Sequence, residues 1–153
     1  MRRAAWMILL PLTLSAGCPS ANDDDEHVCG DLSRAMTYVA GLRATGTDGL
    51  LGARLLQASP APPDVGDNTW SVQIVDMQDG NTPLAGCTGS VDPLMPDHGH
   101  GSASSPTWTE DVEPGSYTVG GMDLFMPGYW EITLALDCAG VADTIVYGFC
   151  AEG

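Results

Sequence analysis

Lysine is absent from this chain and arginine is scarce. The 153 residues hold five basic side chains, all arginine, against twenty acidic ones, so the formal net charge is −15. A nucleic-acid-binding protein needs many cations to neutralise phosphates. We therefore exclude that class and expect no nucleic-acid partner.

Long hydrophobic runs are also missing. The longest apolar stretch, residues 4–14, is shorter than the roughly 20 residues that a membrane-spanning helix needs. Arg2 and Arg3 precede it and small residues follow it, which is typical of a secretory signal peptide. We expect residues 1–17 to be such a signal and the protein to be exported.

The residues around Cys18 predict a lipid anchor. Residues 14–18 read Leu-Ser-Ala-Gly-Cys and resemble a bacterial lipobox, in which the cysteine is lipidated and becomes the new N-terminus. The alternative is an ordinary signal peptide that is cleaved nearby. Lipidation of Cys18 predicts a bacterial protein held in the cell envelope, at the outer membrane or the periplasmic face.

An acidic segment follows the predicted anchor. Residues 18–28 are polar and contain the run Asp-Asp-Asp-Glu-His at positions 23–27. Such a segment buries too little apolar surface to fold by itself, so we predict a flexible tether. The alternative, a cation site in residues 23–27, lacks the spacing of an EF-hand loop.

The rest of the chain is rich in strand and turn signals and poor in helix signals. Nineteen glycines and eleven prolines interrupt short segments with alternating apolar and polar residues. The predicted strands are 37–44, 52–58, 69–76, 86–92, 116–124, 129–137 and 144–150. Their number and spacing predict an all-β fold, an immunoglobulin-like antiparallel β-sandwich of about seven strands, as one domain over residues 29–153. Residues 31–42 instead allow a helical turn.

One motif supports the sandwich independently. Residues 113–119 read Glu-Pro-Gly-Ser-Tyr-Thr-Val, with the acidic-x-Gly-x-Tyr spacing of a tyrosine corner. We expect the hydroxyl of Tyr117 to hydrogen-bond the loop that precedes it.

The cysteines predict two disulfides. With Cys18 lipidated, four cysteines remain, an even number in an exported protein. Strand parity places Cys87 and Cys138 inward, which favours a Cys87–Cys138 bridge between the sheets and a Cys29–Cys150 bridge between the domain ends. The alternatives are the pairing of Cys138 with Cys150 and Cys29 with Cys87, or copper ligation by the thiols, which an oxidising compartment disfavours.

Two histidines lie two residues apart in a glycine-rich segment. Residues 94–101 read Leu-Met-Pro-Asp-His-Gly-His-Gly, and a second Met-Pro pair stands at Met126. If the segment is extended, His98 and His100 point the same way. Imidazole together with the thioethers of Met95 and Met126 suits copper, Met favouring Cu(I). The alternatives are apolar packing for the methionines and loop stabilisation for the histidines.

Four blocks of this chain resemble the YtkA-like domain family. They are residues 67–70 (DNTW), 95–101 (MPDHGHG), 114–117 (PGSY) and 125–131 (FMPGYWE). That family has an immunoglobulin-like sandwich, is common in exported bacterial proteins, and is similar to FixH proteins and more loosely to CopC-type copper carriers. The resemblance implies copper handling, with Met95, His98, His100 and Met126 as ligands.

The sequence predicts no enzyme, since it has no Gly-x-Ser-x-Gly elbow, His-Glu-x-x-His motif or phosphate-binding glycine loop. We therefore expect a copper-binding or copper-delivery module of the cell envelope, with copper as its ion. Its partners would be the membrane, through the lipid, and a protein that donates or accepts copper. The alternative is a structural or protein-interaction module of the envelope that binds no metal.

Overall fold

The computed structural model describes residues 28–153. The expectations for the signal peptide (1–17), for lipidation of Cys18 and for nearly all of the acidic tether lie outside the described residues. Within the described range, no helix has the length and apolar character to cross a membrane.

Strands make up nearly all of the regular structure in residues 28–153, and one 3₁₀ turn, η1 (Leu32–Arg34), precedes them. The strands are β1 (Leu42–Thr45), β2 (Leu51–Ser59), β3 (Gly66–Asp76), β4 (Thr82–Pro83), β5 (Cys87–Met95), β6 (His100–Gly101), β7 (Thr107–Glu110), β8 (Ser116–Leu124), β9 (Gly128–Cys138) and β10 (Val141–Ala151). The predicted all-β class is therefore confirmed.

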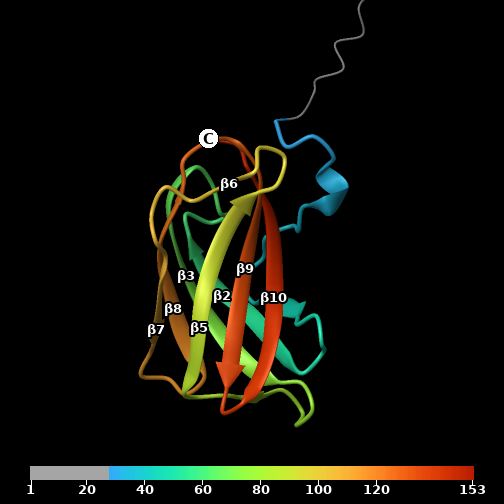
Figure 1. Ribbon diagram of the computed structural model, residues 1–153, viewed down its shortest axis with the longest axis vertical. Coiled ribbons are helices and arrows are strands. Elements are labelled where there is room, and N and C mark those ends of the chain that lie inside the picture. The colour runs from blue at the N-terminus through green and yellow to red at the C-terminus, as the bar shows by residue number, and fades with distance from the viewer. Residues whose placement is uncertain (1–27) are drawn as a thin grey trace, which may run out of the picture.

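The strands form two antiparallel sheets that pack face to face (Figure 1). One sheet has the order β1-β2-β3-β8-β7, with β4 added beside β3, and the other has the order β10-β9-β5-β6. The order β2-β3-β8-β7 opposite β10-β9-β5 matches the ABED and GFC sheets of a constant-type immunoglobulin domain. This topology confirms the predicted immunoglobulin-like sandwich.

The differences from the predicted strands are local. Strand β8 begins and ends where the sequence places it, whereas only the end of the predicted strand 37–44 is paired, as β1. The segment before β1 instead starts with η1, whose first turn is capped by the Asp31 carboxylate accepting from the Ser33 N–H at 2.8 Å. Strands β4, β6 and β7 were not predicted, because two to four residues are too few for alternation to be seen.

Alternating residues of the long strands form the core. In β3, Trp70, Val72 and Ile74 are fully buried, as the period-2 pattern predicts. Trp70 packs edge-on against Tyr147 of the opposite sheet, with ring centroids 5.8 Å apart. Large aromatic side chains from both sheets thus fill the space between them.

The predicted hydrogen bond from Tyr117 to the loop just before it is wrong. The Tyr117 hydroxyl donates to the Leu84 carbonyl at 2.8 Å and accepts from the Cys87 N–H at 2.9 Å. Both groups lie near the start of β5, about thirty residues upstream, and not in the turn just before β8. The reason is that the Tyr117 ring is fully buried and its hydroxyl reaches the start of β5 in the other sheet.

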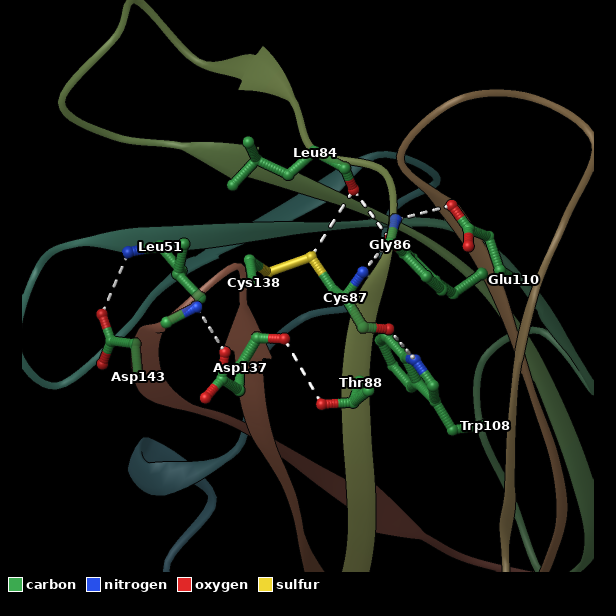
Figure 2. Close-up of a disulfide and its surroundings, with 12 residues drawn as sticks. Leu51, Leu84, Gly86, Cys87, Thr88, Trp108, Glu110, Asp137, Cys138 and Asp143 are labelled. Atoms are coloured by element: carbon green, nitrogen blue, oxygen red, sulfur yellow. Dashed lines mark hydrogen bonds between the residues drawn. A yellow bond between two sulfur atoms is a disulfide. The ribbon is translucent and has the colours of Figure 1, made fainter.

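The two disulfides have the favoured pairing, Cys29–Cys150 and Cys87–Cys138. The expected bridge between sheets is wrong, however, because Cys87 and Cys138 are directly paired in register on neighbouring strands of one sheet, β5 and β9 (Figure 2). Strand parity shows that both side chains face inward, but it cannot show which strands are neighbours. The other bridge ties the segment before η1 to the end of β10.

Candidate metal site

His98 lies in the turn between β5 and β6, and His100 is the first residue of β6, at the end of the sandwich where Figure 1 labels β6. The His98 and Gly99 N–H groups donate to the Met95 carbonyl at 3.1 and 2.8 Å, which closes the turn. Gly99 has a φ of +68°, a conformation that glycine adopts without strain. The two imidazole centroids lie 5.8 Å apart.

Met126 reaches the same place from the loop between β8 and β9. Its sulfur Sδ lies 3.1 Å from Nε2 of His100, although the two residues are 26 positions apart in sequence. The loop is held by the Trp130 indole N–H, which donates to the Met126 carbonyl at 3.1 Å. The sequence placed these residues in two separate motifs, and the fold brings the two motifs together.

Two aromatic rings enclose the His100 imidazole. Phe125 stacks on it with centroids 4.9 Å apart, and Trp130 meets it edge-on at 5.6 Å. Trp130 is fully buried, whereas Phe125 is 45% exposed, so the ring of His100 lies between the core and solvent. The sequence did not assign these two aromatic residues a role, because their contact with His100 depends on the packing of two loops.

Met95 occupies a different environment from Met126. Its side chain is 1% exposed and belongs to the hydrophobic core. Its methyl group covers Gly128, where an added Cβ would lie only 1.9 Å from the Met95 Cε. Of the four predicted ligands, the structure therefore brings Met126 into contact with His100 and places the His98 ring 5.8 Å from that of His100, whereas Met95 lies in the interior.

A salt bridge fixes the turn before His98. The Arg34 guanidinium donates to both carboxylate oxygens of Asp97, with Nη1 2.8 Å from Oδ1. The same guanidinium lies over the Tyr129 ring, 4.1 Å from its centroid. Arg34 and Asp97 are 63 residues apart, so no spacing in the sequence indicated the pair. With its carboxylate engaged by Arg34, Asp97 is not free to serve as a metal ligand.

We expect Arg34→Gln to raise the pKa of Asp97 toward its ordinary value. The hydrogen bond from Arg34 holds the pKa of that carboxyl below its usual range. An NMR titration of the Asp97 carboxyl carbon measures the change. Arg43→Gln removes the same charge at a distant site and should leave the Asp97 titration unchanged; an equal shift in both variants would show that net charge, not the contact, sets the pKa.

Among residues 28–153, no three His, Cys, Asp or Glu side chains are grouped closely enough to hold a metal ion. The third donor beside His98 and His100 is instead the thioether of Met126. The cluster of these three residues consists of two imidazoles and one thioether sulfur, a combination that suits soft or borderline ions and not hard ones such as Ca²⁺ or Mg²⁺.

The fold and the cluster together define an immunoglobulin-like β-sandwich with a His/Met cluster at one end. Residues 55–135 match the family model described as YtkA-like, and the chain belongs to this family.

Among solved structures, the chain is similar to a copper-bound variant of FetP from uropathogenic Escherichia coli. The sequence identity is 13%, the TM-score is 0.48, and the match covers 76% of this chain and 97% of that chain. No curated protein matches the sequence.

Proposed function

We propose that this protein is a copper-binding module of the bacterial cell envelope that delivers Cu(I) to, or accepts it from, a partner protein. His98, His100 and Met126 bind the ion. The observation that carries the proposal is the 3.1 Å approach of the Met126 sulfur to Nε2 of His100, which joins two loops that are distant in sequence.

The spacing of the donors fits one ion. A first-row metal binds imidazole nitrogen at about 2.0 Å and sulfur at about 2.3 Å, so donors 3.1 Å apart can share it. Two imidazoles on one ion have centroids roughly 5–6 Å apart, since each centroid lies about 3 Å from the metal, and His98 and His100 are 5.8 Å apart.

The donors of the cluster favour Cu(I) over harder cations. The net charge of −15 attracts any cation to the surface without selecting among them. Selection comes from the donors, because a thioether prefers Cu(I) and the carboxylate next to His98 in sequence, that of Asp97, is engaged by Arg34. The partly exposed Phe125 beside His100 leaves the ion within reach of an acceptor.

We further propose that residues 1–17 direct export and that Cys18 carries the lipid that anchors the protein. The support is the basic, apolar and small-residue order of the first 18 residues. Both disulfides fit an oxidising compartment. We propose no catalytic activity.

The double variant His98→Ala/His100→Ala should bind Cu(I) at least 100-fold more weakly, because it removes two of the three donors. Loss of a residue that only supports a metal ligand already costs about 10–100-fold in affinity. The measurement is a competition titration of residues 28–153 with a chromophoric Cu(I) chelator, and that part holds the described hydrophobic core and both disulfides. Unchanged Cu(I) affinity in this variant would exclude the site and favour the alternative, an interaction module that binds no metal.

The two methionines provide a matched pair of variants. Met126→Leu removes the sulfur beside His100 and should weaken Cu(I) binding by at least about tenfold. Met95→Leu keeps an apolar side chain of similar volume in the core and should leave the affinity unchanged. Equal losses in both variants would show that Met95 is a ligand and that its assignment to packing is wrong.

A further inference from the structure

We propose that the outer face of the β1-β2-β3 sheet carries a binding site for a small oxyanion, a carboxylate or a phosphate, formed by Arg43 and Arg54. This site lies in the sheet opposite to the one that contains His100, so it is independent of the copper proposal. It uses two of the three arginines found among residues 28–153.

The two arginines are direct cross-strand partners. Arg43 of β1 and Arg54 of β2 are paired in register, so their side chains leave the sheet on the same face. Like charges in this arrangement repel each other unless an anion lies between them. Among residues 28–153 the structure has one ion pair, Arg34 with Asp97, so no described carboxylate neutralises Arg43 or Arg54.

Arg54 has an unused donor. Its Nε is buried and has no hydrogen-bond partner, while its Nη1 donates to Oε1 of Gln73 at 3.3 Å. A buried donor without an acceptor is costly and needs an explanation. An oxyanion bound at this guanidinium would accept that hydrogen bond, and guanidinium groups pair well with planar carboxylates and with phosphates.

A hollow of about 70 Å³ lies beside the two arginines. Thr45 and Asn81 add polar groups to its wall. Gly52 and Met77 also line the hollow, and a Cβ at position 52 would lie only 2.7 Å from the Met77 sulfur, so a side chain there would crowd the lining. The volume suits one oxyanion group and is too small for a nucleotide.

The lining contains no acidic residue. None of the nine described residues around the hollow is Asp or Glu, although the chain has twenty of them. The site is thus a local region of positive charge on a strongly acidic protein. Because the surrounding charge repels anions, we expect weak binding, in the millimolar range, that salt reduces.

The test is an anion titration followed by NMR at the arginine Nε–H groups. Inorganic phosphate and, separately, acetate are added to copper-free protein at constant ionic strength. We expect a saturable shift of the Arg54 Nε–H resonance with at least one anion, and the anion that binds more tightly identifies the ligand class. Arg43→Gln should weaken this binding at least fivefold.

Arg34→Gln is the matched control, since it removes the same charge and leaves the hollow intact; it should bind the anion as the unaltered protein does. The double variant His98→Ala/His100→Ala should also bind the anion as the unaltered protein does. Loss of anion binding and loss of copper binding are therefore distinguished by separate variants. The absence of a saturable shift with either anion, or equal weakening by Arg34→Gln and Arg43→Gln, would overturn the proposal.

Discussion

Asp143→Ala should lower the free energy of unfolding by about 3–5 kcal/mol, because four backbone N–H groups would lose the buried Asp143 carboxylate as their acceptor. The side chain is 4% exposed. Its donors are the N–H groups of Asp48 (3.0 Å), Leu50 (2.9 Å), Leu51 (3.0 Å) and Thr144 (2.7 Å). Asp48 and Leu50 belong to the turn that joins β1 to β2, and Leu51 is the first residue of β2.

The fold is shaped around this carboxylate. A Cβ at Gly46 would lie 2.2 Å from the Asp143 Cγ, so the turn approaches the carboxyl group more closely than any other residue type would allow. The contact joins the β1-β2 turn to β10 of the opposite sheet. Figure 2 shows Asp143 beside Leu51, near the disulfide of Cys138.

Urea denaturation of Asp143→Ala measures the loss. Asp137→Ala is the matched control, because Asp137 is an exposed aspartate in the same sheet whose carboxylate accepts from one N–H, that of Gly140. We expect the control to cost less than about 1.5 kcal/mol, the ordinary value of one hydrogen bond. Equal losses in the two variants would mean that the turn does not depend on Asp143.

The same carboxylate makes stability dependent on pH. Burial alone raises the pKa of Asp143, but its backbone hydrogen bonds lower it more, and the resulting pKa lies below the ordinary value. The stabilisation is therefore complete above the unfolded pKa of about 3.9 and is lost as pH falls through the lower folded pKa. Asp143→Asn should reduce the difference in unfolding free energy between pH 7 and pH 3.

Removal of the Cys29–Cys150 disulfide should destabilise the domain by about 5 kcal/mol in the chain-entropy model. The two cysteines are 121 residues apart, so this bridge closes nearly the whole domain into one loop. The Cys87–Cys138 bridge, with a separation of 51 residues, should contribute about 4 kcal/mol. Thermal and urea denaturation of the two double Cys→Ala variants measure both values.

Removal of the Cys29–Cys150 disulfide should also change the pKa of Asp97. Cys29 lies just before η1, which contains Arg34, and the Cys29 carbonyl accepts from the Arg34 guanidinium at 3.3 Å. Release of Cys29 should therefore loosen the contact of Arg34 with Asp97 and raise the pKa of Asp97. The Cys87→Ala/Cys138→Ala variant should leave that pKa unchanged, since its bridge lies elsewhere in the sheet; the reverse result would contradict the role given to the N-terminal segment.

Much of the fold could be predicted from local patterns. Alternation places Trp70, Val72 and Ile74 in the core because each residue of a strand faces away from its neighbours, whatever the partner strand is. Parity likewise favoured the observed cysteine pairing. It could not show that Cys87 and Cys138 share a sheet, since the order of strands depends on how both sheets pack.

The sequence by itself determined the two-sheet, all-β class, the inward face of the long strands and the type of donor in the His/Met motifs, because these follow from residue chemistry and a two-residue period. Only the tertiary structure decided that Met126 meets His100 while Met95 faces the core, and that Arg34 pairs with Asp97. Such contacts join loops from different strands, and their distance in sequence carries no signal until the core has fixed where each strand ends.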